Sequence, residues 1–175
     1  CKGTHIRYMG TGTEKVEEEI AKIYGEKSFI RMDADTTSGK NSHEAILNRF
    51  QNEKIPILLG TQMVTKGHDF PAVTLVGVLN ADTSLNMPDF RAAERTYQLL
   101  SQVAGRAGRA ELPGEAVIQT YNPSQSAIRF AAKGDFAAFA EEELENRKEA
   151  YFPPYCHLSV INLRSQASEL VANWA

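Results

Sequence analysis

Apolar side chains recur every three to four residues in several stretches of the chain, a spacing that predicts amphipathic helices. Thr13 and Ser42 stand in front of the first two stretches, where each can cap the N-terminus of a helix. The predicted buried positions are Val16, Ile20 and Ile23 in the first helix and Ile46, Leu47 and Phe50 in the second. Each helix should therefore bury one face and expose the other.

A third helical pattern runs from Arg91 to Ala107, and a fourth covers residues 124–150. The predicted apolar positions are Ala93, Tyr97, Leu100 and Ala104 in the third and Ile128, Phe136, Phe139 and Leu144 in the fourth. The sequence YFPPY at 151–155 should end the last helix, because proline lacks the backbone N–H and also restricts the residue before it.

Short apolar runs between the helical patterns predict strands. The predicted strands are SFIRM at 28–32, IPILLG at 55–60, VTLVGVLN at 73–80 and EAVIQTY at 115–121. The last three are continuous apolar runs, which are typical of strands buried on both faces. This alternation of strands and helices predicts an α/β domain with a mainly parallel sheet. A further strand is expected at residues 158–163, beyond the proline break.

The composition is that of a folded, weakly acidic protein, with 42% apolar residues and a net charge of −3. Modules that hold DNA by electrostatics alone are usually basic, so any contact with DNA should depend on a few local groups. No apolar stretch is long enough to cross a bilayer, and the two cysteines are far apart, as in proteins of a reducing compartment. These features predict a soluble cytoplasmic protein that makes no contact with a membrane.

Two glycine-containing stretches only partly match nucleotide-binding motifs. SGKNS at 38–42 lacks the first glycine and the final hydroxyl of a phosphate-binding loop, since Ala34 and Asn41 occupy those positions. GTGTEK at 10–15 has Lys15 where a dinucleotide fingerprint requires its third glycine. The sequence also lacks an HExxH zinc motif. It therefore predicts no self-sufficient active site.

The clearest candidate site is QVAGRAGR at 102–109, which places Arg106 and Arg109 on one face of a continuing helix. Guanidinium groups are permanently charged, and their planar fork of donors suits phosphate oxygens. The small residues around them leave room for a ligand, although each glycine costs a helix about 1 kcal/mol relative to alanine. A solvated helix end capped by Gly105 is the alternative interpretation of the same residues.

A second candidate is the loop GTQMVTKGHDFP at 60–71, directly after a predicted strand. Loops at the carboxyl ends of parallel strands are where α/β proteins place ligand contacts. The groups that could contact a ligand are those of Thr61, Gln62, Thr65, Lys66, Gly67 and Asp69. A polar loop with a glycine turn would explain this stretch alone, but the arginine pair further along the chain favours a binding site.

These two stretches resemble motifs V and VI of superfamily 2 helicases, and the chain resembles the PriA family of bacterial replication-restart helicases. Further matching segments are GTGTEKVEEE at 10–19, DADTTSGK at 33–40, PDFRAAERTYQLLSQVAGRAGRA at 88–110, GEAVIQTYNP at 114–123 and the FPPY break at 152–155. The resemblance covers nearly the whole chain. It implies the second RecA-like lobe of a motor, followed by the beginning of a C-terminal α+β domain.

The resemblance also implies roles for single residues. In these motors two lobes clamp ATP, and the first lobe, which this sequence lacks, holds the phosphate loop and Mg²⁺. Arg106 and Arg109 would be catalytic arginine fingers that reach the γ-phosphate, while Gln102 would couple their motif to the other lobe. The implied nucleotide contacts are Gly67, Asp69, Gln102, Arg106 and Arg109, and the implied contacts with the DNA backbone are Thr61, Gln62 and Lys66.

The full-length protein implied by the resemblance is an ATP-dependent helicase that moves 3′ to 5′ on DNA. It would unwind abandoned replication forks and help to assemble the primosome. Its implied partners are forked DNA, primosome proteins and single-strand-binding proteins, in the bacterial cytoplasm at the nucleoid. Because the phosphate loop and the magnesium site are missing, the chain by itself should not hydrolyse ATP.

Cys1 also acquires an implied role. Members of the family carry an insertion whose paired cysteines bind zinc as Cys₄ sites, and Cys1 resembles the last of these cysteines. Zinc would need ligands from outside the chain, because a structural site takes four. Cys156 is expected to be buried or half-buried, while His43, His68 and His157 have no metal-ligand spacing.

The predicted organisation has four parts: the end of the zinc-binding insertion at 1–12, the RecA-like lobe at 13–123, a helical connection at 124–150 and the start of a C-terminal domain at 151–175. A chain without an initiator methionine that ends within a helical pattern is expected to be part of a longer protein. The family lobe also draws one strand from upstream of the insertion. Its absence should expose a sheet edge and favour self-association.

Two alternatives remain open from the sequence. The chain could be the lobe of another superfamily 2 motor, such as a RecG-like or DEAD-box enzyme. It could instead be a non-enzymatic adaptor whose arginine pair binds an acidic patch on another protein. The amino-acid sequence of the loop at 60–71 and the junction between Cys1 and GTGTE favour the PriA family over other motors.

Overall fold

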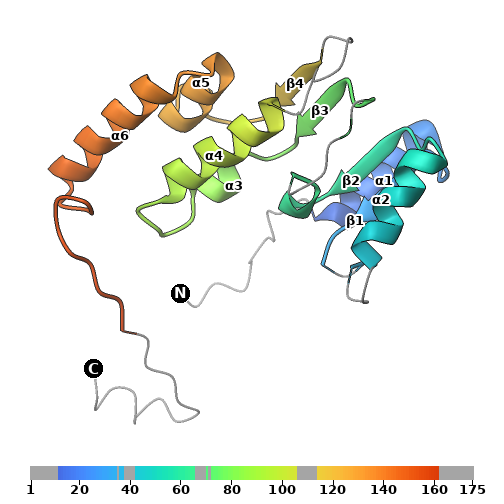
Figure 1. Cartoon of the computed structure of the whole chain (residues 1–175), viewed down its shortest axis with the longest axis horizontal. Coiled ribbons are helices and arrows are strands. Elements are labelled where there is room, and N and C mark those ends of the chain that lie inside the picture. The colour runs from blue at the N-terminus through green and yellow to red at the C-terminus, as the bar shows by residue number, and fades with distance from the viewer. Residues whose placement is uncertain are drawn as a thin grey trace, which may run out of the picture. The chain divides into compact units, whose positions relative to one another are not determined.

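The chain forms two compact units, Cys1–Phe70 and Pro71–Ala175. The structure, a computed structural model, describes residues 12–34, 36–37, 42–65, 70, 72–105 and 114–161 (Figure 1). Each unit contains a pair of parallel strands with helices between and after them. The prediction of an α/β fold with parallel strands is therefore confirmed, with the described strands arranged in two pairs.

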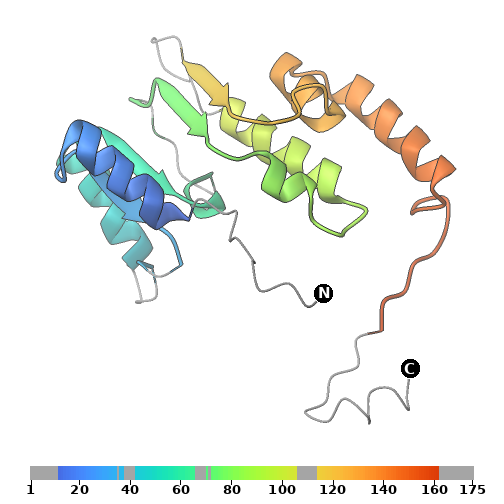
Figure 2. The same ribbon diagram turned by 180° about the vertical axis from the view of Figure 1, so that it is seen from behind.

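The first unit is built on the parallel strands β1 (Phe29–Met32) and β2 (Ile57–Gly60). Helix α1 (Thr13–Tyr24) precedes β1, α2 (Ser42–Asn52) connects the two strands, and the short 3₁₀ helix η1 (Gln62–Thr65) follows β2. The two α-helices lie on opposite sides of the strand pair, as the opposite views in Figures 1 and 2 show. A helix that connects two neighbouring strands is the usual way to join parallel strands.

The small core of the first unit comes from alternate strand residues and one helix. Ile30, Met32, Leu47 and Leu59 are its buried apolar residues. The expected burial of Leu47 is confirmed, but Ile23 is 68% exposed and α1 has no buried residue. Polar contacts hold this helix instead. Thr13 is the first helical residue rather than the N-cap, which is Gly12, and its hydroxyl bonds to Asp33.

The second unit begins with β3 (Leu75–Val78), which pairs in parallel with β4 (Glu115–Ile118). Between them lie the short helix α3 (Asp82–Leu85) and the longer helix α4 (Ala92–Ala104). Helices α5 (Ser126–Lys133) and α6 (Phe136–Glu149) follow, and α5 packs along α4. The core is a single cluster formed by Ala81, Tyr97, Leu100, Ala127, Ile128, Ala131 and Phe139.

Within the described residues of the second unit, one face of β3 and β4 packs against the core. Val78 and Ile118 pack against the core, whereas Leu75 is 60% and Val117 50% exposed. The described part of the second unit therefore buries one face of this pair, whereas the sequence predicted burial of both faces. An apolar run shows that a strand can be buried, but the number of elements that cover it depends on the tertiary structure.

The region predicted as one helical stretch at 124–150 contains two helices. Gly134 separates them in a left-handed conformation, with φ 67°, and Asp135 then caps α6 by accepting from the backbone N–H of Ala138. Phe139 is buried as expected, but Phe136 is 65% exposed. Leu144, at 40% exposed, also departs from the prediction.

The chain beyond α6 is irregular where it is described. The helix ends before the YFPPY sequence, as predicted. Residues 158–161 form no strand, and Ile161 is 83% exposed. The apolar pattern alone cannot make a strand there, because a strand needs a neighbour to satisfy its backbone. The domain boundary near 151 and the α+β character of the C-terminal domain stay predictions. Among the described helices, none is long and apolar enough to cross a membrane.

Candidate functional site

The structure places three of the predicted site residues. Thr61 and Gln62 follow β2 in the first unit, Gln102 lies on α4 in the second, and all three are exposed. The others lie outside the described residues: Cys1, Lys66, Gly67, Asp69, Arg106 and Arg109. The described part of the site is therefore the set of elements that lead into these residues.

At the carboxyl end of β2, the segments β1, β2 and η1 lie very close to one another. Gly60, its last residue, pairs with Met32 of β1. A Cβ atom on Gly60 would clash with the carbonyl oxygen of Met32 and with a methyl group of Val64. The N–H of Val64 donates to the carbonyl of Thr61 at 3.1 Å, which closes the turn that begins η1. Only glycine lets β2 pass into this turn without displacing β1.

Asp33 follows β1 at the same edge and collects most of the polar contacts there. It is 4% exposed and accepts hydrogen bonds from the Thr13 hydroxyl at 3.0 Å and from the Thr36 backbone N–H and hydroxyl, each at 3.1 Å. Its Oδ2 also lies 3.0 Å from Nε of Arg31. Arg31 in turn donates to Glu17 on α1 at 2.7 Å. One carboxylate thus fixes α1, β1 and the following turn together.

The charge on Asp33 is stabilised by these contacts. Burial alone would raise its pKa, but the Thr36 backbone N–H, the Thr13 and Thr36 hydroxyls and the charge of Arg31 hold the pKa below its usual range. Asp33 was noted only as the first residue of the matching segment DADTTSGK, and no role in the site was predicted for it, although a polar residue directly after a parallel strand is a general signal. Asp33 follows Met32, which pairs with Gly60, and Thr61 follows Gly60. Asp33 therefore supports the start of the loop that was predicted to bind a ligand.

Replacing Asp33 by asparagine should lower the free energy of unfolding at pH 7 by about 1–2 kcal/mol, since the charged acceptor is lost. The stabilisation exists while Asp33 is ionised, so the difference between the two proteins should shrink as the pH falls below about 4. Urea titrations of the 175-residue chain at several pH values, followed by circular dichroism, would measure it.

Asp135→Asn is the matched control, because asparagine caps a helix as well as aspartate does. It should leave stability nearly unchanged. A loss for Asp33→Asn that is equally large at pH 3 and pH 7 would contradict the role given to the ionised carboxylate.

Helix α4 carries Gln102 and ends directly before the predicted arginine pair. Its C-cap, Gly105, has φ −71°, an ordinary right-handed conformation that any residue adopts. The N–H of Gly105 donates to the carbonyl of Ser101 at 3.0 Å. Gly105 is thus the C-cap that the alternative interpretation expects, although it does not adopt the left-handed conformation that would require glycine. A Cβ there would lie 3.3 Å from the Ser101 carbonyl, a close but limited contact.

Asp82 fixes the carboxyl ends of β3 and β4 to each other. It accepts hydrogen bonds from the hydroxyl of Thr120 at 2.9 Å and from the backbone N–H of Tyr121 at 3.0 Å. The Tyr121 N–H is the main reason why the pKa of Asp82 lies below its usual range. This carboxylate, like Asp33, was not predicted, and both follow the ends of parallel strands.

Metal ligands are sparse in the described part of the chain. No group of three or more His, Cys, Asp or Glu side chains there could hold a metal ion. Cys156 is a half-buried free cysteine, as predicted. Cys1 lies outside the described residues, and a single cysteine could contribute one of the four ligands of a zinc site.

The model of the family described as "Helicase conserved C-terminal domain" matches residues 3–111. The chain belongs to this family. The match includes the whole first unit from residue 3, helix α4 and both stretches that resemble helicase motifs V and VI. Strands β1, β2 and β3, helix α4 and the loop after β2 are thus parts of a helicase C-terminal domain, and β4 follows shortly after the matched residues.

Three relatives show where such a domain occurs. The chain is 53% identical to "Replication restart protein PriA" of Bacillus subtilis over 163 residues, 93% of the chain and 20% of the relative. It is 48% identical to the protein of the same name from Chlamydia trachomatis, over 90% of the chain and 21% of the relative. The corresponding values for Haemophilus influenzae are 42%, 99% and 24%. The chain thus spans about a fifth to a quarter of the length of these relatives.

Proposed function

We propose that the chain is the second motor lobe of an ATP-dependent DNA helicase that restarts replication. The observation that carries this proposal is the helicase-domain match over residues 3–111, which includes both GTQMVTKGHDFP and QVAGRAGR. The printed name of the relatives supports the role in replication restart. Neither of the alternative interpretations, another motor or an adaptor, has comparable support.

The nucleotide-binding site would be completed by the residues that follow α4. Arg106 and Arg109 act as arginine fingers that stabilise charge on the γ-phosphate during transfer to water. Gln102 lies on the last turn of α4, a helix whose other face is buried in the core. Its exposed side chain is therefore suited to contact the other lobe. Gly105, the C-cap of α4, leads directly into the arginine pair in the sequence.

The loop after β2 would serve both ligands. Gly67 and Asp69 face the nucleotide, whereas Thr61, Gln62 and Lys66 contact the DNA backbone. The exposure of Thr61 and Gln62 at the carboxyl edge of β2 supports this assignment. Hydrogen bonds from hydroxyl and amide groups hold phosphates without a basic surface, in agreement with the net charge of −3.

The remaining properties belong to the full-length protein. ATP and Mg²⁺ would be held mainly by a first lobe, and zinc by cysteines of which Cys1 is one. Translocation 3′ to 5′ on forked DNA, and contacts with primosome and single-strand-binding proteins, complete the proposal. The exposed Leu75 and Val117 of β3 and β4, and strand pairs that contain only two strands each among the described residues, support self-association of the chain when it is separated from that protein.

The isolated 175-residue chain should show no ATP hydrolysis above background, with or without single-stranded DNA. The sequence has no phosphate-binding loop, so the β- and γ-phosphates and the metal ion would have no site. A coupled-enzyme assay at millimolar ATP would measure this, with the full-length protein as the positive control. Steady turnover by the purified chain, equal in independent preparations, would contradict the assignment of this chain as a second lobe.

A further inference from the structure

Helix α4 is held firmly at the end opposite to the proposed arginine fingers. It has 13 residues, so its two ends are about 20 Å apart. Tyr97, in its middle, stacks on Phe139 of α6 with ring centroids 4.3 Å apart. Tyr97 and Leu100 are buried in the core. The helix should therefore move as one rigid element, and its orientation is set by what it packs against.

Arg147 of α6 makes the polar part of this attachment. Its Nη2 donates to Glu94 of α4 at 2.8 Å, and its Nε donates to Glu143, one turn earlier on α6, also at 2.8 Å. The side chains of Arg147 and Glu143 are only 12% and 11% exposed. One guanidinium thus satisfies two carboxylates from two helices, an arrangement that a lysine cannot reproduce because it lacks the fork.

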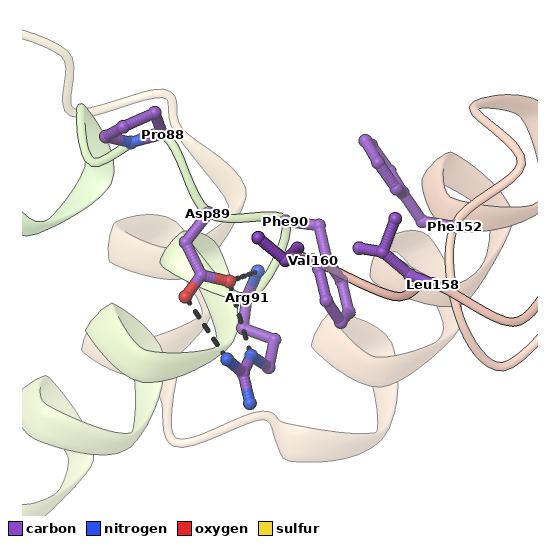
Figure 3. Close-up of a pocket in the computed structure, with 7 residues that line it drawn as sticks. All are labelled: Pro88, Asp89, Phe90, Arg91, Phe152, Leu158 and Val160. Carbon is purple, nitrogen blue, oxygen red and sulfur yellow. Dashed lines mark hydrogen bonds and ion pairs between the residues drawn. The ribbon is translucent and has the colours of Figure 1, made fainter. Parts of the chain in front are cut away.

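The same guanidinium also holds the chain that follows α6. Its carbon lies 5.1 Å from the ring centroid of Phe90, which precedes α4. Phe90 in turn stacks on Phe152 beyond α6, with centroids 5.6 Å apart. Figure 3 shows both rings near Leu158 and Val160. These four residues line a pocket of about 520 Å³. The start of α4 therefore contacts both α6 and the segment that leads away from the helicase domain.

We propose that Arg147 is a positioning residue for the arginine pair. It fixes α4, the helix that leads into Arg106 and Arg109, to α6 and to the segment around Phe152. This inference rests on the proposed function, because it assumes that the arginines after Gly105 act on ATP. It assigns a role in ATP turnover to a residue outside the family match at 3–111.

The test replaces Arg147 by lysine in the full-length protein. The kcat for DNA-stimulated ATP hydrolysis should fall by about 10- to 100-fold, because small displacements of a catalytic group have effects of this size. The KM for ATP should change less than about threefold, because the arginines act mainly on the transition state. Thermal unfolding and circular dichroism establish that the variant is folded.

Two further variants keep the test decisive. Glu94→Gln, on a 40% exposed side chain, retains the fold and should lower kcat in the same direction. Arg129→Lys is the matched control, because Arg129 of α5 forms another inter-helical ion pair, with Glu142 of α6 at 2.6 Å, and this pair includes no residue of α4. It should leave both kcat and KM unchanged.

The outcomes separate the inference from the proposed function. Folded Arg147→Lys and Glu94→Gln proteins with unchanged kcat would overturn the inference, as would an equal loss in Arg129→Lys. If Arg106→Ala also retained full ATP hydrolysis, the proposed function itself would fail. If Arg106→Ala is inactive and the two positioning variants are fully active, only the inference is wrong.

Discussion

Replacing Arg106 by alanine in the full-length protein should lower the kcat for DNA-stimulated ATP hydrolysis by about 10³-fold or more. An arginine that enters a nucleotide site from a second lobe stabilises the charge that develops on the phosphate oxygens, and such groups contribute factors of about 10³ to 10⁵. Arg109→Ala should have an effect of the same order. Steady-state ATPase assays with saturating single-stranded DNA would measure both.

Binding of the nucleotide and of DNA should survive these replacements. The main nucleotide contacts are proposed for the first lobe, so the affinity for ATP should fall much less than kcat. Fork binding, measured by fluorescence anisotropy, should stay within a few-fold of the unchanged protein. A variant that loses partner binding but keeps its ATP turnover would instead indicate an adaptor.

Arg95→Ala is the matched control for the arginine variants. Arg95 lies on the same helix, is 56% exposed and pairs with Asp89 at 2.9 Å, away from the end that leads to Arg106. A solvent-exposed ion pair of this kind contributes little, so kcat should stay within about twofold. A comparable loss in Arg95→Ala would show that any change of charge on α4 disturbs the enzyme.

Gly60→Val should destabilise the first unit by about 3 kcal/mol or more. The Cβ alone would clash with the carbonyl oxygen of Met32 and with Val64, and the Met32 oxygen is backbone that can move only if β1 moves. Overpacking of this kind typically costs about 1–3 kcal/mol, and more when backbone is displaced. Urea denaturation followed by circular dichroism would show an earlier transition for the first unit.

The control for this change is Gly77→Val in β3. An added Cβ at Gly77 has no atom within 4 Å, and valine favours strands, so stability should be unchanged or slightly increased. If Gly60→Val unfolded at the same urea concentration as the unchanged chain, the close approach of β1, β2 and η1 described here would be wrong.

The sequence predicted the elements well because their signals are local. Apolar runs located β1 and β2 to within two residues, and the helical period located α4. Burial was harder to predict, because it depends on what covers each face. Ile23 fits the helical period but is exposed, since α1 is held by the polar contacts of Thr13 and Arg31 rather than by apolar packing.

The polar contacts that organise the site could not be predicted from spacing. Thr13 and Asp33 are 20 residues apart, and Glu94 and Arg147 are 53 apart, so no periodic pattern connects them. The motif residues were found for a different reason. GTQMVTKGHDFP and QVAGRAGR resemble helicase motifs residue by residue, and this resemblance identified the family without any prediction of secondary structure.

The central claim is that this lobe completes a nucleotide site with Arg106 and Arg109. A crystal structure of the full-length protein with DNA, Mg²⁺ and a transition-state analogue of ATP hydrolysis would test it most directly. The account predicts that guanidinium nitrogens of both arginines lie about 2.7–3.2 Å from oxygen or fluorine atoms at the γ-phosphate position. Both side chains facing solvent in that complex, with the two lobes closed, would contradict it.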